Sequence, residues 1–198
     1  MGLRGLAIAV VLAASLGAAG WAVTDRLEQD DDFCNACHVS VGMPLHREIR
    51  RDFDARPAVS LAGAHAAAGS AGREDGAFRC IDCHGGASWL GRARVKTLAA
   101  KDAFFYVVGH FEEPRSMAWP LWDEDCRKCH TGFDEPADEG GDAQRFHALA
   151  VHNARLGVDC VECHLAHATG VDRGAHFLAA PTVRAQCARC HTEFAQGG

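Results

Sequence analysis

The sequence lacks the surplus of positive charge that a nucleic-acid-binding surface needs. Its 20 lysine and arginine residues are outnumbered by 26 aspartates and glutamates, which gives a formal net charge of −6. The basic residues are also dispersed rather than gathered in one patch, so we expect no nucleic-acid partner. The 198 residues, of which 48% are hydrophobic and 23% charged, suffice for one domain or two small ones and exclude disorder over most of the chain.

The sequence also has no cysteine outside one repeated pattern. All ten cysteines fall in five Cys-x-x-Cys-His motifs. The cysteine pairs are Cys34 and Cys37, Cys80 and Cys83, Cys126 and Cys129, Cys160 and Cys163, and Cys187 and Cys190, and the histidines that follow them are His38, His84, His130, His164 and His191. This pattern is typical of covalent c-type haem attachment, in which two thiols form thioethers with the porphyrin and the histidine binds the iron. The motifs therefore predict five covalently bound haem c groups.

Three other uses of cysteine fit less well. Structural zinc sites combine Cys-x-x-Cys pairs into sets of four ligands, but five pairs cannot all combine two by two, and zinc does not require a histidine after every second cysteine. A disulfide scaffold normally spreads its cysteines to join distant loops. A thioredoxin-like motif needs a βαβ context, which this sequence does not suggest.

The N-terminus carries the one long apolar run. Residues 5–23 are 19 uncharged, mostly apolar residues, and a helix of this length is about 28 Å long, just enough to cross a bilayer. Trp21 suits the membrane interface, and a polar run from Thr24 ends the apolar segment. We expect a retained anchor over residues 1–24 and a haem-binding domain over residues 25–198. The alternative is a cleaved signal peptide, for which the small residues at 16–20 offer a cleavage site.

Charge does not decide the orientation of this helix, because Arg4 on one side is matched by Arg26 on the other. Covalent haem attachment in bacteria takes place on the outer face of the inner membrane. We therefore expect a single-pass protein of the bacterial inner membrane with its haem domain on the periplasmic side.

The spacing of the motifs predicts the fold class. Their first cysteines are separated by 46, 46, 34 and 27 residues, and segments this short cannot each build a side-chain core. We expect a mainly α chain with extensive coil, wrapped around five haems that form the core. Residues 92–108 and 143–156 have helical periodicity, whereas the Ala/Gly-rich stretch 55–77 and the acidic stretch 134–142 are expected to be surface loops.

Seven histidines lie outside the motifs, and five haems need at most five further axial ligands. The candidates are His46, His65, His110, His152, His167 and His176. In the helix expected at 143–156, His152 lies nearer the apolar stripe than His147, which we expect to be solvated or in reserve. For the first haem, Met43 and His46 both remain candidates, and a thioether would raise its potential whereas an imidazole would lower it.

Five features follow one another along residues 5–170. They are the apolar helix, Phe33-Cys-Asn-Ala-Cys-His38 with Met43 close behind, Cys80-Ile-Asp-Cys-His84 followed by a Trp- and Lys-bearing helix, the run from Gly109 to Trp119 before the third motif, and His152 and His167 on either side of the fourth. In this order they resemble the NapC/NirT family of membrane-anchored multihaem cytochromes c, which includes NrfH-type proteins. The fifth motif departs from that family's four-haem core and also fits the pentahaem subunit of assemblies such as alternative complex III.

The resemblance implies oxidation of membrane quinol near the first haem and electron transfer to a periplasmic acceptor or reductase. It nominates Lys96, Lys101 and Asp102 as polar groups of a quinol site, although they can also be exposed helix charges. Two alternatives remain: an electron-relay subunit of a larger respiratory membrane complex without its own quinol site, and a soluble periplasmic shuttle.

Overall fold

The computed structural model describes residues 2–36, 45–110, 121–132, 147, 152 and 158–195. Within these ranges the chain is helical with much coil, and it forms no strand beyond an isolated bridge between His164 and Leu178. The helices are α1 (Leu3–Leu27), α2 (Asp31–Ala36), α3 (Leu45–Asp54), α4 (Leu61–Ala68), α5 (Cys80–His84), α6 (Trp89–Val107), α7 (Asp123–Arg127), α10 (Cys160–Cys163), α11 (Ala180–Cys187) and α12 (Thr192–Ala195). The predicted mainly helical class with extensive coil is confirmed for these residues.

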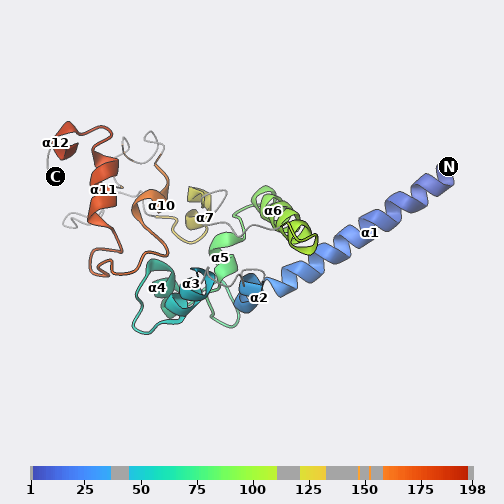
Figure 1. Cartoon of the computed structure of the whole chain (residues 1–198), viewed down its shortest axis with the longest axis horizontal. Coiled ribbons are helices and arrows are strands. Elements are labelled where there is room, and N and C mark those ends of the chain that lie inside the picture. Colours follow the sequence, from blue (N-terminus) through green and yellow to red (C-terminus); the bar gives the residue numbers. More distant parts are fainter. Residues whose placement is uncertain are drawn as a thin grey trace.

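Helix α1 projects away from the rest of the molecule (Figure 1). Its 25 residues include an apolar stretch of mean hydropathy 2.1, and none of the side chains in that stretch is buried. A helix that exposes apolar residues on every side is suited to lipid rather than water. The structure thus has one long apolar N-terminal helix, of a kind that serves as an anchor or as a signal sequence.

Helix α6 begins three residues before the predicted start at 92. Ser88 caps it, since the Ser88 Oγ accepts a hydrogen bond of 3.1 Å from the Gly91 N–H. Gly109 follows the helix with a φ of 76°, in the left-handed region that glycine favours. The helix predicted for residues 92–108 is therefore confirmed.

The loop expected at residues 55–77 contains a helix, and this part of the prediction was wrong. The buried Ser60 caps α4 by accepting a hydrogen bond from the Gly63 N–H at 3.1 Å. Helix α4 packs on α3, where a Cβ at Gly63 would lie 2.9 Å from the Asp52 carbonyl oxygen. Glycine is thus required for the close approach of the two backbones.

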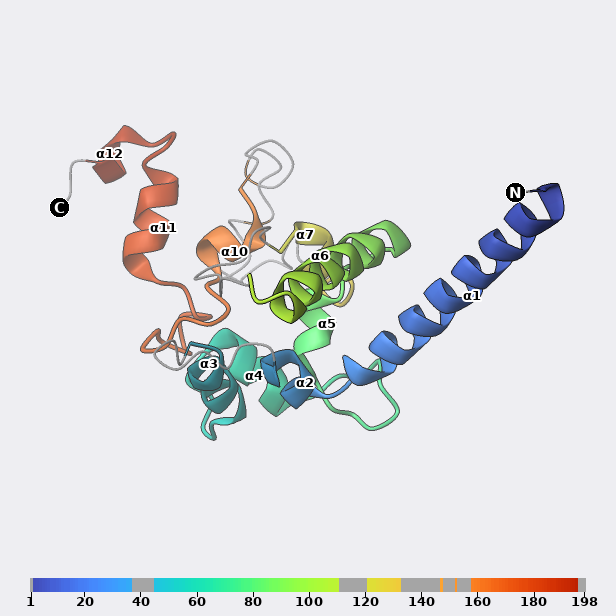
Figure 2. The same ribbon diagram turned by 45° about the vertical axis from the view of Figure 1, so that its right-hand side comes forward.

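Few apolar side chains are buried in the described part of the chain. They are Phe53, Ala62 and Phe177. The short helices leave α1 in the order α2, α5, α7, α10 and α11, and each contacts the next, so that α11 and α12 lie at the end opposite the N-terminus (Figures 1 and 2). The described part of the chain is therefore a succession of helical turns with very little protein core of its own.

Candidate functional site

Each described Cys-x-x-Cys-His motif forms a single helical turn. The His130, His164 and His191 N–H groups donate to the carbonyls of the first cysteine of their own motifs at 3.0, 2.9 and 2.9 Å. Such a turn brings the two cysteines, three residues apart, to the same face. The pattern therefore folds locally into a unit that presents two thiols and one imidazole together.

Acidic side chains cap the start of three of these turns. Asp82 Oδ2 and Glu162 Oε2, inside the second and fourth motifs, accept hydrogen bonds of 2.7 Å from the N–H groups of Arg79 and Asp159. Asp125 directly precedes Cys126 of the third motif, and its Oδ2 accepts from the Trp122 N–H at 3.2 Å. These bonds satisfy N–H groups that the first turn of a helix leaves without a partner.

Aspartates also connect successive motifs. Asp31 precedes Cys34 by three residues, and its Oδ1 accepts a hydrogen bond of 2.9 Å from the Cys80 N–H of the second motif. Asp123 precedes Cys126 by the same three residues, and its Oδ1 accepts from the Cys160 N–H of the fourth motif at 2.8 Å. The first pair of motifs and the pair formed by the third and fourth are thus joined in the same way.

Four motif histidines each lie opposite a histidine from outside the motifs. The ring centroids are 6.1 Å apart for His84 and His167, 5.9 Å for His130 and His65, 6.2 Å for His164 and His147, and 6.2 Å for His191 and His152. Two imidazoles that bind one metal ion from opposite sides through bonds of about 2 Å have centroids about 6 Å apart, once about 1 Å is added for each ring. All four separations match this geometry.

Hydrogen bonds orient three of these imidazoles. His65 Nδ1 lies 2.9 Å from the Leu61 carbonyl oxygen, and His164 Nδ1 lies 3.3 Å from that of His176. His191 Nδ1 lies 3.1 Å from Glu193 Oε1. A histidine that donates from Nδ1 keeps Nε2 free as an acceptor, which is the arrangement of metal-ligating histidines. Burial also lowers the pKa of His164, which favours the neutral ring that a metal requires.

Three of the predicted ligands, His65, His152 and His167, are brought opposite a motif histidine. His110 and His176 belong to none of the four pairs. His38, Met43 and Cys37 lie outside the described residues, as does the side chain of His46.

His147, expected to be solvated or in reserve, lies opposite His164 with the rings tilted by 17°. Sequence reasoning missed it because the ranking assumed one straight helix over 143–156 with a single apolar stripe. Most of that segment lies outside the described residues. The count of seven spare histidines was the only sequence feature that pointed to His147.

The described cysteines are free thiols, and most of them are partly buried. Burial, together with the negative charge of Asp31, raises the pKa of Cys34 to about 11. Burial raises the pKa of Cys83 to about 11 and that of Cys80 still further. Thiols that keep their protons at neutral pH are poor nucleophiles, so their environment does not favour thiol–disulfide chemistry.

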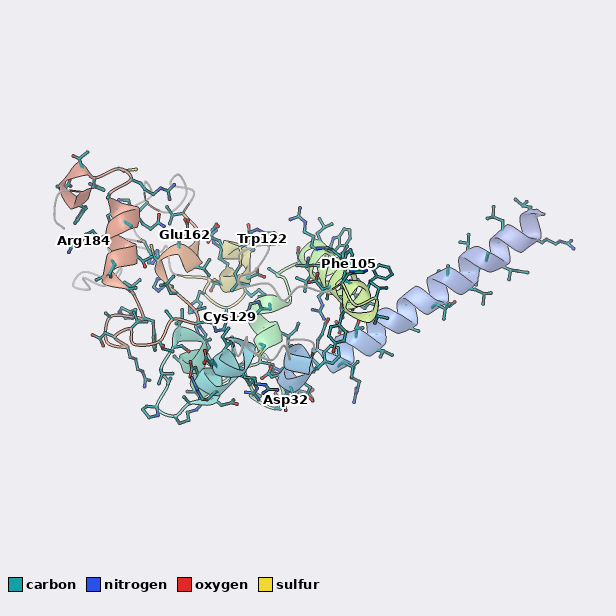
Figure 3. The ribbon with its side chains drawn as sticks, in the orientation of Figure 1. Asp32, Phe105, Trp122, Cys129, Glu162 and Arg184 are labelled. Carbon is teal, nitrogen blue, oxygen red and sulfur yellow. The ribbon has the colours of Figure 1, made fainter. Side chains whose placement is uncertain are left out.

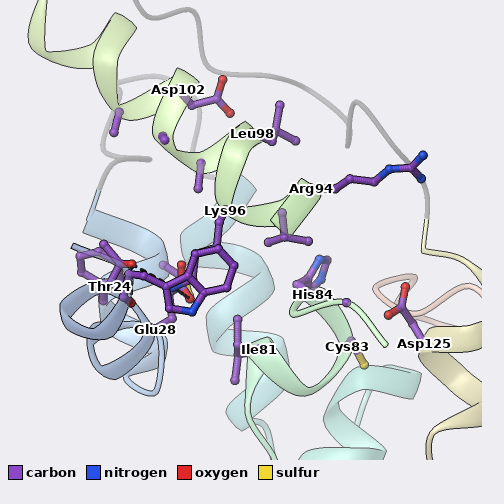
Figure 4. A pocket seen from close by; sticks show the side chains of 18 of the residues that line it. Thr24, Glu28, Ile81, Cys83, His84, Arg94, Lys96, Leu98, Asp102 and Asp125 are labelled. Atoms are coloured by element: carbon purple, nitrogen blue, oxygen red, sulfur yellow. Dashed lines mark hydrogen bonds and ion pairs between the residues drawn. The ribbon is translucent and has the colours of Figure 1, made fainter. Parts of the chain in front are cut away.

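A cavity of about 660 Å³ lies where α1, α5, α6 and α7 meet. Its lining includes Gly17, Gly20 and Trp21 of α1 as well as Cys83 and His84 of the second motif. Figure 4 shows Lys96 between Glu28 and His84, with its side chain toward Glu28 and Thr24. The cavity therefore connects the apolar helix with the histidine pairs.

Lys96 is nearly buried, with 9% of its side chain exposed, and four neighbours surround its ammonium group. Its Nζ lies 2.7 Å from Glu28 Oε2, 2.9 Å from Thr24 Oγ1 and 3.5 Å from Asp25 Oδ1, and 5.6 Å from the centre of the Trp21 ring. Buried charges are costly unless they are paired in this way.

A second cation completes the junction between α1 and α6, since Arg92 forms ion pairs with both Asp25 and Glu28. Glu28, whose side chain is 11% exposed, thus joins Arg92 and Lys96. Sequence reasoning nominated Lys96 but not its acidic partners, because they lie more than sixty residues away along the chain.

The other two quinol-site candidates are placed differently. Asp102 lines the cavity, whereas Lys101 is absent from its lining and 61% of its side chain is exposed.

The described residues hold no group of three or more histidine, cysteine or acidic side chains that could bind a metal ion alone. Haem iron needs only two protein ligands, because the porphyrin supplies the others, so the absence of such a group does not bear on haem binding.

Comparison with protein-family models, curated proteins and solved structures gives no match to this chain.

Proposed function

We propose that this chain is a membrane-anchored pentahaem c-type cytochrome that carries electrons from the quinol pool to a periplasmic acceptor. The observation that carries the proposal is the set of four imidazole pairs, each of which joins a motif histidine to a histidine elsewhere in the chain at 5.9–6.2 Å. The NapC/NirT resemblance agrees with it. The chain would occupy the bacterial inner membrane as a single-pass protein.

The residues present fit the proposed haems in two respects. The sequence supplies five cysteine pairs for thioether bonds, of which the structure describes four in full, and four histidine pairs have the separation that a bis-imidazole iron requires. The scarcity of buried apolar side chains leaves the flat porphyrins to serve as the core. When bound, each haem would supply an iron that gains and loses one electron, at a potential lowered by imidazole ligands.

The order of the motifs supports a route away from the membrane. Helix α2, which carries Cys34, contacts α5, and the contacts continue through α7 and α10 to α11. The Cys160 N–H donates to Asp123, three residues before Cys126, so the third and fourth attachment sites adjoin. Electrons would enter near α1 and leave near α11 and α12.

Quinol would bind at the outer end of the cavity between α1 and α6. There the residues from α1 lie next to lipid if α1 is a retained anchor, and Lys96 and Asp102 supply polar groups. Lys96 would hold a quinol oxygen through its ammonium group, and the Asp102 carboxylate would accept a released proton. Glu28 keeps the Lys96 ammonium group in place.

A second function is favoured by the exposure of α1. None of the side chains in its apolar stretch is buried, so every face of the helix is free for helices of a larger membrane complex. In that case the chain would relay electrons without oxidising quinol itself.

The test combines haem content with quinol reduction. We expect the purified protein to carry the mass of five haems and, in its oxidised form, to be reduced by a short-chain quinol analogue. Lys96→Met and Asp102→Asn should slow that reduction at least about tenfold, as expected for loss of a positioned acid–base group, whereas the exposed Lys101→Met should not.

Each outcome points to one conclusion. Fewer than five haems would refute the cofactor assignment. Five haems with reduction only inside a larger complex would support the relay subunit instead. Equal effects of the substitutions at Lys96 and Lys101 would remove the quinol site from this cavity.

A further inference from the structure

Helix α6 carries apolar side chains that the protein leaves uncovered. At its C-terminal end the exposed fractions are 62% for Phe104, 39% for Phe105, 46% for Tyr106 and 82% for Val107. At its N-terminal end Trp89 is 77% exposed. Soluble proteins rarely expose aromatic residues in such clusters, and clusters of this kind mark contact with lipid or with another protein.

The helix is fixed to α1 just beyond the apolar run. Arg92 and Lys96 pair with Asp25 and Glu28, and Lys96 lies over the ring of Trp21. Tryptophan is enriched at the level of the lipid headgroups. The ion pairs therefore hold α6 at the level where α1 would leave the membrane.

The two helices cross steeply. Figure 1 shows α1 along its length and α6 strongly foreshortened, and Figure 2, turned about the vertical axis, shows α6 along more of its length beside the C-terminal part of α1. Figure 3 labels Phe105 on α6. Because a spanning helix is tilted by only about 20° from the membrane normal on average, a helix that crosses it steeply lies nearly parallel to the membrane surface.

The exposed residues of α6 suit that position. Aromatic side chains lie at both of its ends, and the exposed Lys101 and Arg94 provide positive charge between them. Interfacial helices combine aromatic residues that enter the headgroup region with basic residues that attract anionic lipids.

We propose that α6 is a second membrane contact, which lies in the lipid interface and inserts Phe104, Phe105 and Val107 into the leaflet that α1 enters. The occupant of this surface is the bilayer, because α6 is fixed at the end of the membrane helix itself. The proposal rests on α1 being a retained anchor, and it does not depend on haem or quinol chemistry.

Hydroxyl-radical footprinting of the unsubstituted protein tests this. The full chain would be placed in nanodiscs of phosphatidylcholine and phosphatidylglycerol. Phe194 of α12, 46% exposed and far from α1, is the matched control. We expect the peptide with Phe104, Phe105 and Tyr106 to be oxidised several-fold less than the peptide with Phe194. Oxidation in proportion to the exposed fractions would overturn the proposal.

Photo-crosslinking distinguishes lipid from protein as the occupant. A benzophenone amino acid would replace Phe104 or Val107, and Phe194 in the control, with helical circular dichroism used to verify folding. We expect lipid adducts at the two α6 positions and none at Phe194. Adducts to a second protein chain or to a co-purifying protein would overturn the proposal. Release of the protein from membranes by alkali would instead show that α1 is not an anchor, while the haem content reports separately on the proposed function.

Discussion

The junction of α1 and α6 differs from the region of the cysteine motifs in what holds it together. At the junction, Glu28 and Lys96 are nearly buried and bonded to each other, with Arg92 and Asp25 around them. The motif region is joined by hydrogen bonds between short turns, and its histidine rings face each other across gaps of metal-binding width. The junction is thus held by ion pairs between protein side chains, whereas the motif region is held by hydrogen bonds between short turns and buries few apolar side chains.

This difference predicts that the stability of the junction and the stability of the motif region depend on different interactions. A region whose core is a cofactor gains its folding free energy when the cofactor binds. The junction should depend little on that event, because its ion pairs lie within the protein. Substitutions in the two regions should therefore have effects of different size and kind.

The largest effect is expected from loss of one attachment site. The double substitution Cys126→Ser, Cys129→Ser should reduce the covalent haem content from five to four. It should also speed proteolysis within residues 121–195 on the order of tenfold or more, because local opening replaces a packed core. Limited proteolysis with mass spectrometry would measure both. If cleavage within α1 and α6 were accelerated equally, the junction would depend on the cofactor as much as the motif region does, and the expected difference between the two regions would be wrong.

His65→Ala should open one axial position. Without the imidazole opposite His130, one iron of the five becomes able to bind carbon monoxide, and titration of the reduced protein would count one new site. His176→Ala is the matched substitution, since His176 belongs to none of the four pairs and approaches His164 through its backbone carbonyl. A new site in both variants, or in neither, would contradict the pairing.

Glu28→Gln should weaken the junction. The change leaves the nearly buried Lys96 with only Asp25 as an acidic partner, and we expect a loss of about 1–3 kcal/mol in the free energy of unfolding. Lys101→Met removes an exposed charge 3.8 Å from Asp102 and should cost no more than about 0.5 kcal/mol. Chemical denaturation in detergent, followed by helical circular dichroism, would compare them, and equal losses would show that burial does not matter here.

The smallest effect is expected at the links between motifs. Asp123→Ala removes the acceptor of the Cys160 N–H and should cost about 1 kcal/mol, as for loss of a helix cap. The exposed neighbour Glu124→Ala should change stability by less than about 0.5 kcal/mol. Thermal unfolding would measure both variants. A larger loss for Glu124→Ala would argue against the link between the third and fourth motifs.

Some of this architecture could be predicted from local sequence. The apolar run of α1, the helical turns at the motifs and the periodicity of α6 are properties of neighbouring residues. Helix α4 was missed because its Ala-rich sequence lacks the polar and apolar alternation that marks an amphipathic helix. Whether this segment is a helix or a loop depends on the cap at Ser60 and on the close packing at Gly63, and both are seen only in the folded chain.

The candidate site likewise has a part that local sequence predicts and a part that it does not. The motifs identify the cysteines and one histidine of each site, but the partners of the motif histidines come from distant segments. His65 faces His130, and His167 faces His84. Ranking His152 above His147 by helical angle also failed to foresee that each would face a different motif. Such pairings depend on tertiary packing, and residues that are far apart in the chain leave no periodic pattern in a single sequence from which their contact could be predicted.

If the proposed haems bind between these distant pairs, the pairings constrain the order in which the protein can mature. His167 follows four of the five motifs, yet it faces the histidine of the second. A chain exported from its N-terminus could therefore receive its second porphyrin early but could not finish coordinating it until most of the polypeptide had crossed the membrane. Export and maturation would then be complete only when the last segments folded back over the first.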